Sequence, residues 1–268
     1  MLYEKDGWPV VRCGGCGLVF VGRQPSPDEL IALYDEDYYE DPAAEGYASY
    51  AAAEERKRIH DRSLLADLER LVAPGDLLEI GCAYGFFLDE ARARGWRVRG
   101  VEPSTHAADE ASRRLGISIP TVAFTDLAVE PSSLDAVVMW DVVEHLPNPR
   151  ATVEAAERWL RPGGVLALST GNIRSSAARL HGIDWSLMTP PWHQFYFSRK
   201  TMRRLLTSAG LTVARIGGDG ALAVDRASPA PRVPVRLAAV LESRPVTTVA
   251  RRLHAGSIMF AFARKGPR

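Results

Sequence analysis

No run of about 18 apolar residues occurs in this 268-residue sequence, so no segment is expected to span a membrane. The first residues, MLYEKDGWPVVRC, lack the apolar core of a secretory signal. The three cysteines are too few for a disulfide framework and fit a reducing compartment. Together these absences predict a cytoplasmic protein.

The sequence also lacks an excess of charge of either sign. Lys and Arg number 33, as do Asp and Glu, which argues against a dedicated nucleic-acid-binding protein. The balance is uneven, because the segment from Arg226 to Arg268 contains nine basic residues and one acid, Glu242. A hydrophobic content of 46% is sufficient for the core of one large α/β domain.

What the sequence does contain is an alternation of short apolar runs with helical patterns. Several runs are continuously apolar, which is typical of a sheet covered on both faces. The last run is expected to pair antiparallel at the sheet edge. The predicted strands are 76–80, 97–101, 118–123, 135–140, 164–170, 211–217 and 257–264.

Further segments flank this core. The pattern Ser-Pro-Asp-Glu at 26–29 predicts a helix start, and a long helix is expected over 47–72. No internal repeat is visible. The predicted divisions are a hairpin at 1–24, helices at 25–73, the core at 74–217, a helical insertion at 218–256 and the final strand at 257–268.

A glycine turn and an acid give the strongest functional signal. The strand predicted at 76–80 runs into Gly-Cys-Ala-Tyr-Gly at 81–85, and the next strand ends on Glu102, 21 positions after Gly81. This spacing is typical of the first βαβ unit of a nucleoside-binding fold, with a tight turn below the ligand and a carboxylate for its ribose hydroxyls.

The spacing within the turn distinguishes between ligands. A dinucleotide site needs G-x-G-x-x-G, whose middle glycine lets the backbone approach a pyrophosphate. Here the middle position is Ala83, between Gly81 and Gly85, and no Lys or Arg is near. S-adenosylmethionine needs the turn and the acid without a phosphate cradle, so the pattern favours it over NAD.

At this point the sequence resembles the class I S-adenosylmethionine-dependent methyltransferases. The matching stretches are LLEIGCAYG at 77–85, VRGVEPS at 98–104, LDAVVMWDVVEHLPNP at 134–149, WLRPGGVLALST at 159–170 and HQFYFSRKTMRRLLTSAG at 193–210. They follow the family's order through most of 75–216. Ala83 departs from the glycine of many members.

The resemblance implies a Rossmann-like, doubly wound α/β sheet of seven strands, with the last strand antiparallel. It also implies that S-adenosylmethionine lies against the ends of the first, second and fourth strands of the core. The cofactor residues that it implies are Glu79, Gly81, Cys82, Ala83, Gly85, Phe86, Glu102, Pro103, Asp126 and Asp141.

Two histidines are the candidate catalytic bases. Methyl transfer from a sulfonium is an in-line displacement that mainly needs proximity, but a hydroxyl acceptor must also lose a proton. His145 follows the fourth strand of the core, and His193 lies in a loop after the fifth, where Trp192 and Tyr196 are expected to line the acceptor. The alternative interpretations are a structural role for the histidines and core packing for the aromatic side chains.

Cys13 and Cys16 resemble the second half of an N-terminal zinc ribbon found in some relatives of this family. A structural zinc needs four ligands, and no cysteine pair precedes these two. We therefore predict no bound zinc, unless two chains share one ion, and assign no metal ligands.

The predicted function is methyl transfer to a small molecule, with oxygen as the favoured acceptor atom ahead of carbon or nitrogen. A non-catalytic cofactor-binding adaptor, an NAD-dependent oxidoreductase and a nucleic-acid methyltransferase are the alternatives. The basic stretch 235–253 predicts either an ordinary helical cap or a surface that attracts an anionic acceptor or an anionic membrane surface. The chain is expected to be a monomer or a homodimer.

Overall fold

A computed structural model describes residues 1–26, 29, 54–122, 127–218 and 256–267. Within them, Ser26 and Glu29 form the reciprocal hydrogen bonds of a helix N-cap, with Ser26 Oγ accepting from the Glu29 amide at 3.1 Å and Glu29 Oε2 accepting from the Ser26 amide at 2.8 Å. The helical insertion predicted at 218–256 lies outside the described residues, apart from its first and last positions.

The core is a six-stranded mixed sheet with the strand order β5-β4-β6-β7-β10-β9. Strands β4 to β7 are mutually parallel, whereas β10 is antiparallel to both β7 and β9. The strands are β4 (Asp76–Ile80), β5 (Arg97–Val101), β6 (Leu134–Met139), β7 (Leu160–Gly171), β9 (Leu211–Gly218) and β10 (Ile258–Lys265).

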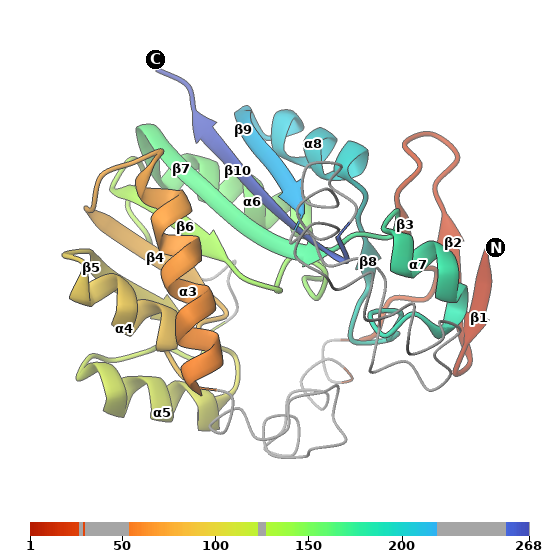
Figure 1. The fold of residues 1–268 in the computed structure, drawn as a ribbon, viewed down its shortest axis with the longest axis horizontal. Coiled ribbons are helices and arrows are strands. Elements are labelled where there is room, and N and C mark those ends of the chain that lie inside the picture. Colours follow the sequence, from red (N-terminus) through yellow and green to blue (C-terminus); the bar gives the residue numbers. More distant parts are fainter. Residues whose placement is uncertain (27–28, 30–53, 123–126, 219–255, 268) are drawn as a thin grey trace, which may run out of the picture.

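Helices cover both faces of this sheet (Figure 1). Helices α3 (Glu54–Glu69), α4 (Phe86–Ala93) and α5 (Thr105–Leu115) bury one face, on which Leu77 lies. Helices α6 (Pro149–Trp159) and α8 (Arg199–Ser208) pack on the other face with Leu78. This alternation of neighbouring residues between two cores explains why the central strands are continuously apolar.

Two strand predictions were wrong. Residues 118–122 form no strand, because Pro120 has no amide to donate and only its carbonyl accepts a bond, from the Glu102 amide at 3.2 Å. The final strand is antiparallel as predicted but does not lie at the edge, since β10 is inserted between β7 and β9. In this strand order β9 is the edge strand, with β10 as its neighbour.

The helix predicted over 47–72 is described as α3, from Glu54 to Glu69. Its buried side chains Leu64, Leu65 and Leu68 recur at helical spacing and face the sheet. Among the described residues, no helix is both long and apolar enough to cross a membrane.

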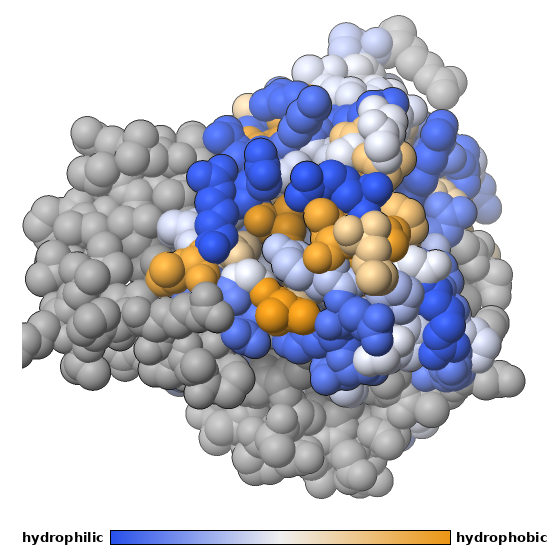
Figure 2. All heavy atoms as spheres, turned by 90° about the vertical axis from the view of Figure 1, so that its right-hand side faces the viewer, coloured by the Kyte–Doolittle hydropathy of each residue, from blue (hydrophilic) through white to orange (hydrophobic). Residues whose placement is uncertain are grey.

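A second, small sheet joins the N-terminus to the core. It consists of β1 (Tyr3–Lys5), β2 (Trp8–Arg12), β3 (Val19–Val21) and β8 (Phe195–Tyr196), in that order. Together with α7 (Ser176–His181) it encloses its own apolar cluster around Trp185. Figure 2 views the molecule from this side, and apolar residues there are interspersed with hydrophilic ones. Strands β1, β2 and β3 thus pair antiparallel in sequence, and β8, which follows His193, extends the sheet beside β3.

Candidate active site

The glycine turn after β4 requires its glycines. Gly81 and Gly85 have φ angles of +72° and +75°, where other residues are strained. A Cβ on Gly81 would lie 2.5 Å from Cγ2 of Val142, which follows β6. The amides of Gly81 and Cys82 donate to the Val101 carbonyl at 2.9 and 3.2 Å, which fastens the turn to β5.

Glu102 at the end of β5 holds the same turn through its side chain. The carboxylate is 2% exposed and accepts from the amides of Ala83 at 2.9 Å and Ser104 at 3.0 Å. Ala83 has a φ of +46°, so this alanine occupies the left-handed region in which glycine is relaxed. Pro103, beside Glu102, is exposed at the rim.

A buried group of ionisable side chains lies beneath the turn. Glu79 on β4 is 3% exposed, and burial raises the pKa of its carboxyl well above the ordinary value. Its Oε2 has no hydrogen-bond partner within the described part of the chain. From α3, burial lowers the pKa of Lys57 and raises that of Asp61 to about 7. The charge of Lys57 partly offsets the rise in the pKa values of Glu79 and Asp61. The charges of these two carboxyls and of Asp141 in turn favour the protonated form of Lys57.

The contribution of α3 was not predicted from the sequence. The available signal was the placement of Lys57 and Asp61 four residues apart on the helix face that also carries Leu64, Leu65 and Leu68. An ionisable pair within the apolar stripe of a helix indicates a polar site on the opposite element.

Asp61 gives a pH prediction. Its pKa is about 7 in the folded chain and about 3.9 when unfolded, so between these values the folded state binds more protons. Ionisation of this carboxyl therefore lowers the free energy of unfolding as the pH rises from about 4 to 7, by at most about 1.4 kcal/mol per pH unit. Urea unfolding of Asp61→Asn should show a flatter pH dependence than the unsubstituted chain.

Asp67→Asn on the same helix is the matched control, because Asp67 pairs on the surface with Arg70 at 2.5 Å and Arg215 at 2.9 Å. Identical pH slopes in the Asp61 variant and the parent chain would contradict the assignment of a raised pKa to Asp61.

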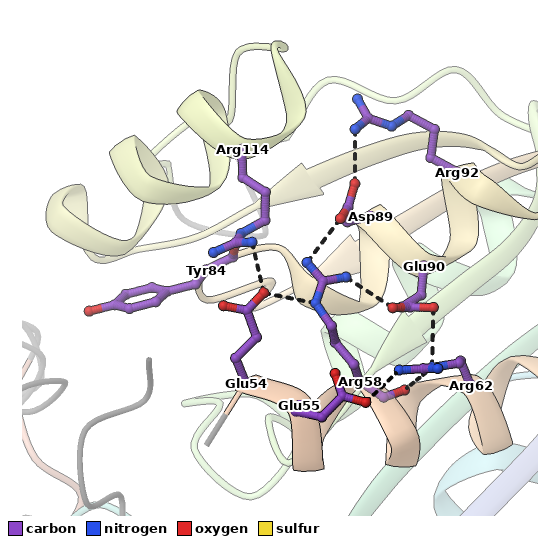
Figure 3. A network of polar contacts seen from close by, with 9 residues as sticks. All are labelled: Glu54, Glu55, Arg58, Arg62, Tyr84, Asp89, Glu90, Arg92 and Arg114. Carbon is purple, nitrogen blue, oxygen red and sulfur yellow. Dashed lines mark hydrogen bonds and ion pairs between the residues drawn. The ribbon is translucent and has the colours of Figure 1, made fainter. Parts of the chain in front are cut away.

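An ion network holds α3 and its neighbours around the turn (Figure 3). Arg58 on α3 contacts Glu54 at 2.8 Å and both Asp89 and Glu90 of α4 at 3.0 Å. Arg114 of α5 contacts Glu54 at 3.1 Å. The side chain of Arg58 is only 16% exposed, so its three carboxylates are partly screened from water and raise its pKa.

Tyr84 in the turn and Phe86 directly after it lie next to this ion network. The carbonyl of Tyr84 accepts from Arg114 Nε at 3.1 Å, and its hydroxyl is 3.1 Å from His106 Nε2. Phe86, the first residue of α4, is buried below the guanidinium of Arg114, which lies 4.4 Å from the ring centroid. Cys82 is also buried, and burial raises the pKa of its thiol.

Asp141 follows the end of β6, at the same edge of the sheet as the glycine turn and Glu102. Asp141 is exposed, has a φ of +53°, and its Oδ1 accepts from Ser169 Oγ at 2.8 Å. The Trp140 ring packs 5.3 Å from that of Phe87. Asp126, the remaining predicted cofactor residue, lies outside the described residues.

The two candidate bases meet, although 48 positions separate them. The His145 and His193 rings are 4.7 Å apart between centroids and nearly perpendicular. His145 Nδ1 bonds the Trp192 carbonyl at 2.9 Å, and His193 Nδ1 bonds the Leu187 carbonyl at 2.8 Å. Burial lowers the pKa of His145 well below its usual value, and the nearby His193 adds to this effect.

The histidines are also connected to the glycine turn. The amide of His145 donates to the carbonyl of Val142 at 2.9 Å, and Val142 is the residue that closes over Gly81. Tyr196 is buried with its ring centroid 6.5 Å from that of His193, whereas Trp192 is half-buried. The predicted acceptor wall and the predicted cofactor turn are therefore adjacent.

Glu144 was not predicted as a site residue. It is 3% exposed, and its Oε2 has no hydrogen-bond partner among the residues described. Burial, and then the charge of Asp141, raises the pKa of Glu144 to about 8. Its position beside His145 was the only sequence signal.

Cys13 and Cys16 are free and half-buried at the end of the β2–β3 hairpin. Amide hydrogen bonds, first that of Cys16, lower the pKa of the Cys13 thiol. In the described ranges these thiols belong to no group of three or more metal-ligating side chains, so the prediction of no bound zinc at this hairpin stands untested.

Known proteins match this chain as follows. A family described as a methyltransferase domain matches residues 47–216. The ubiquinone biosynthesis O-methyltransferase of Cupriavidus pinatubonensis is 30% identical over 53% of this chain and 62% of its own length, so the chain spans less than two thirds of that relative. The protein of the same name from Chromobacterium violaceum is 30% identical over 58% of this chain and 72% of its own.

Among solved structures, geranyl diphosphate C-methyltransferase from Streptomyces coelicolor A3(2), in complex with Mg²⁺, geranyl diphosphate and S-adenosyl-L-homocysteine, superposes with a TM-score of 0.60. It is 16% identical and covers 90% of this chain and 99% of its own. At this identity the likeness shows the fold alone, and it confirms the predicted Rossmann-like α/β class.

Proposed function

This chain belongs to the class I S-adenosylmethionine-dependent methyltransferases, and we propose that it transfers the methyl group of that cofactor to a hydroxyl group of a small molecule. The observation that carries the proposal is the contact of the half-buried His145 with the buried His193, which adjoins the glycine turn through Val142. The O-methyltransferase names of the relatives from Cupriavidus and Chromobacterium support oxygen as the acceptor atom.

The residues around the turn fit the cofactor. The positive φ angles of Gly81 and Gly85 hold the turn in a conformation that other residues adopt only under strain, and the unpartnered Oε2 of Glu79 suits a cationic amino group. Glu102, which accepts from the amides of Ala83 and Ser104 at the end of β5, is the carboxylate placed for the ribose hydroxyls. Lys57, whose pKa burial lowers while Asp61, Asp141 and Glu79 favour its charged form, lies within electrostatic range of these carboxyls and suits the carboxylate of the cofactor.

The bound cofactor supplies a methyl group on a positively charged sulfur. When bound, it would donate this methyl group to the acceptor oxygen, and its sulfur would leave with the electron pair of the carbon–sulfur bond. The chain holds the two reactants in line and removes the hydroxyl proton. His145 is suited to that step, because Nδ1 donates to the Trp192 carbonyl and Nε2 then carries the lone pair that accepts the proton.

The test has a binding arm and a turnover arm. Calorimetry should show binding of S-adenosylmethionine and S-adenosylhomocysteine but no binding of NAD. Among phenols, carboxylates and amines offered as acceptors, a phenol or another hydroxyl compound should be methylated. Binding of the cofactor without turnover on any acceptor would instead favour the non-catalytic adaptor.

His145→Ala should lower kcat by about 10²- to 10⁴-fold, the usual contribution of a general base, while the affinity for S-adenosylhomocysteine stays within twofold. The separate measurement of kcat and of cofactor affinity distinguishes a catalytic effect from misfolding. A variant that turned over at the parent rate would remove His145 from the reaction.

A further inference from the structure

Three metal-ligating side chains converge on the acceptor side of the site. The ligand atoms of Glu144, His145 and His193 all lie within 4.8 Å of one another. Zinc–nitrogen bonds are about 2.0–2.1 Å long, so two ligand atoms of one ion lie about 3–4 Å apart. Small side-chain rotations would therefore bring the three atoms onto one cation.

Both imidazoles are held as metal-bound imidazoles usually are. The Nδ1 atoms of His145 and His193 bond the backbone carbonyls of Trp192 at 2.9 Å and Leu187 at 2.8 Å. A carbonyl can only accept, so each Nδ1 carries the proton and each Nε2 carries a lone pair. Fixing the tautomer and the ring orientation by such a bond is the common support of a metal-ligating histidine.

Glu144 supplies the carboxylate, and backbone contacts hold it in place. Its carbonyl accepts from the amides of Gln194 at 2.9 Å and Phe195 at 3.2 Å, which ties the loop of His193 to the segment of His145. The Gln194 side chain donates to the His145 carbonyl at 2.9 Å. The carboxylate is 3% exposed, and its Oε2 has no partner among described residues. Thr170 and the amide of Gly171 hydrogen-bond the Glu144 carboxyl group, and Oε2 is the oxygen left to bind a cation, whose charge would favour the ionised form.

We propose that Glu144, His145 and His193 bind one divalent cation of the zinc class, which holds the acceptor hydroxyl as a further ligand. Two imidazoles and one carboxylate suit zinc and its transition-metal neighbours, whereas magnesium and calcium favour oxygen ligands. Three protein ligands leave a coordination position open, which is the arrangement of catalytic rather than structural zinc.

The inference rests on the proposed function and changes how the acceptor is activated. A hydroxyl bound to the cation releases its proton to solvent, and the resulting oxygen anion attacks the methyl carbon as the carbon–sulfur bond breaks. The histidines then act as ligands, and the cation replaces the general base.

Cobalt is the probe for this site, because Co²⁺ takes zinc positions and absorbs visible light. The full-length chain, stripped with a chelator and dialysed, should bind one Co²⁺ with visible absorption that Zn²⁺ displaces. His193→Ala and Glu144→Gln should weaken Co²⁺ binding at least tenfold, while the affinity for S-adenosylhomocysteine reports that each variant is folded.

The matched control is the double variant Cys13→Ser, Cys16→Ser, which removes the pair of thiols that could also bind Co²⁺. It should keep the Co²⁺ absorption unchanged. The proposal is overturned if the parent chain binds no Co²⁺, or if the absorption survives His193→Ala and is lost in the cysteine variant.

Turnover separates this inference from the proposed function. If the stripped chain methylates a hydroxyl acceptor at the full rate, the cation has no part in the reaction and the inference fails while the function stands. If Co²⁺ binds as described but no acceptor is methylated, the metal-binding triad stands and the proposed function fails. Loss of turnover on stripping and its return with Zn²⁺ would support both.

Discussion

Glu102→Ala is expected to lower the affinity for S-adenosylhomocysteine at least tenfold. In the proposed complex the variant loses two charge-assisted hydrogen bonds to ribose, each worth about 1.5–3 kcal/mol. It also loses the acceptor for the amides of Ala83 and Ser104, so the turn that carries the cofactor becomes less well held. Calorimetric titration measures the affinity directly.

Glu102→Gln separates these two contributions. The amide side chain keeps one oxygen that can accept from the turn, but it has no charge and only one acceptor atom for the ribose. Its affinity should fall between those of the parent and the alanine variant. Unchanged affinity in Glu102→Ala, with the parent melting temperature, would place the cofactor away from this carboxylate.

Gly81→Ala should be among the most destabilising single changes in the core, at about 2–5 kcal/mol. The new Cβ would lie 2.5 Å from Val142 Cγ2, at a backbone φ of +72°. The left-handed conformation alone costs an alanine about 1–2 kcal/mol, and the overlap adds an overpacking cost of about 1–3 kcal/mol. Urea unfolding gives the free energy, and cofactor affinity should fall in parallel because the turn must move.

Two further variants separate strain from overlap. Gly116→Ala changes a glycine with a φ of +62° and no described atom within 4 Å of its new Cβ, so it should show the conformational cost alone. Val142→Ala removes the colliding methyl groups and should restore part of the stability in combination with Gly81→Ala. Equal losses for Gly81→Ala and Gly116→Ala would show that Val142 accommodates the methyl group without cost.

The turn and Glu102 could be predicted because each belongs to one continuous stretch and the βαβ unit fixes their separation. The meeting of His145 with His193 could not, since it depends on the hydrogen bonds of Gln194 and Phe195 to Glu144. The position of β10 in the sheet was also not predicted correctly. Its apolar pattern does not specify which strands lie on either side of it.

The two ionisable side chains that α3 adds to the site were not predicted, because their role depends on being buried. Lys57 and Asp61 read as surface charges in the sequence, and only packing of the helix over β4 places them with Glu79. The predicted strand at 118–123 contains Pro120, whose missing amide cannot donate to a ladder, and 118–122 form no strand.

The pairing of β3 with β8 joins the N-terminal hairpin to the loop of His193, the segment that we propose lines the acceptor. Val21 donates its amide to the Gln194 carbonyl at 2.8 Å, and Phe20 is in register with Phe195, two positions beyond His193. The first 21 residues and the loop around His193 are therefore one structural unit, whose two segments have to match each other. A chimera that exchanges acceptor preference between relatives has to carry both segments, because either alone would meet a strand partner of the wrong shape.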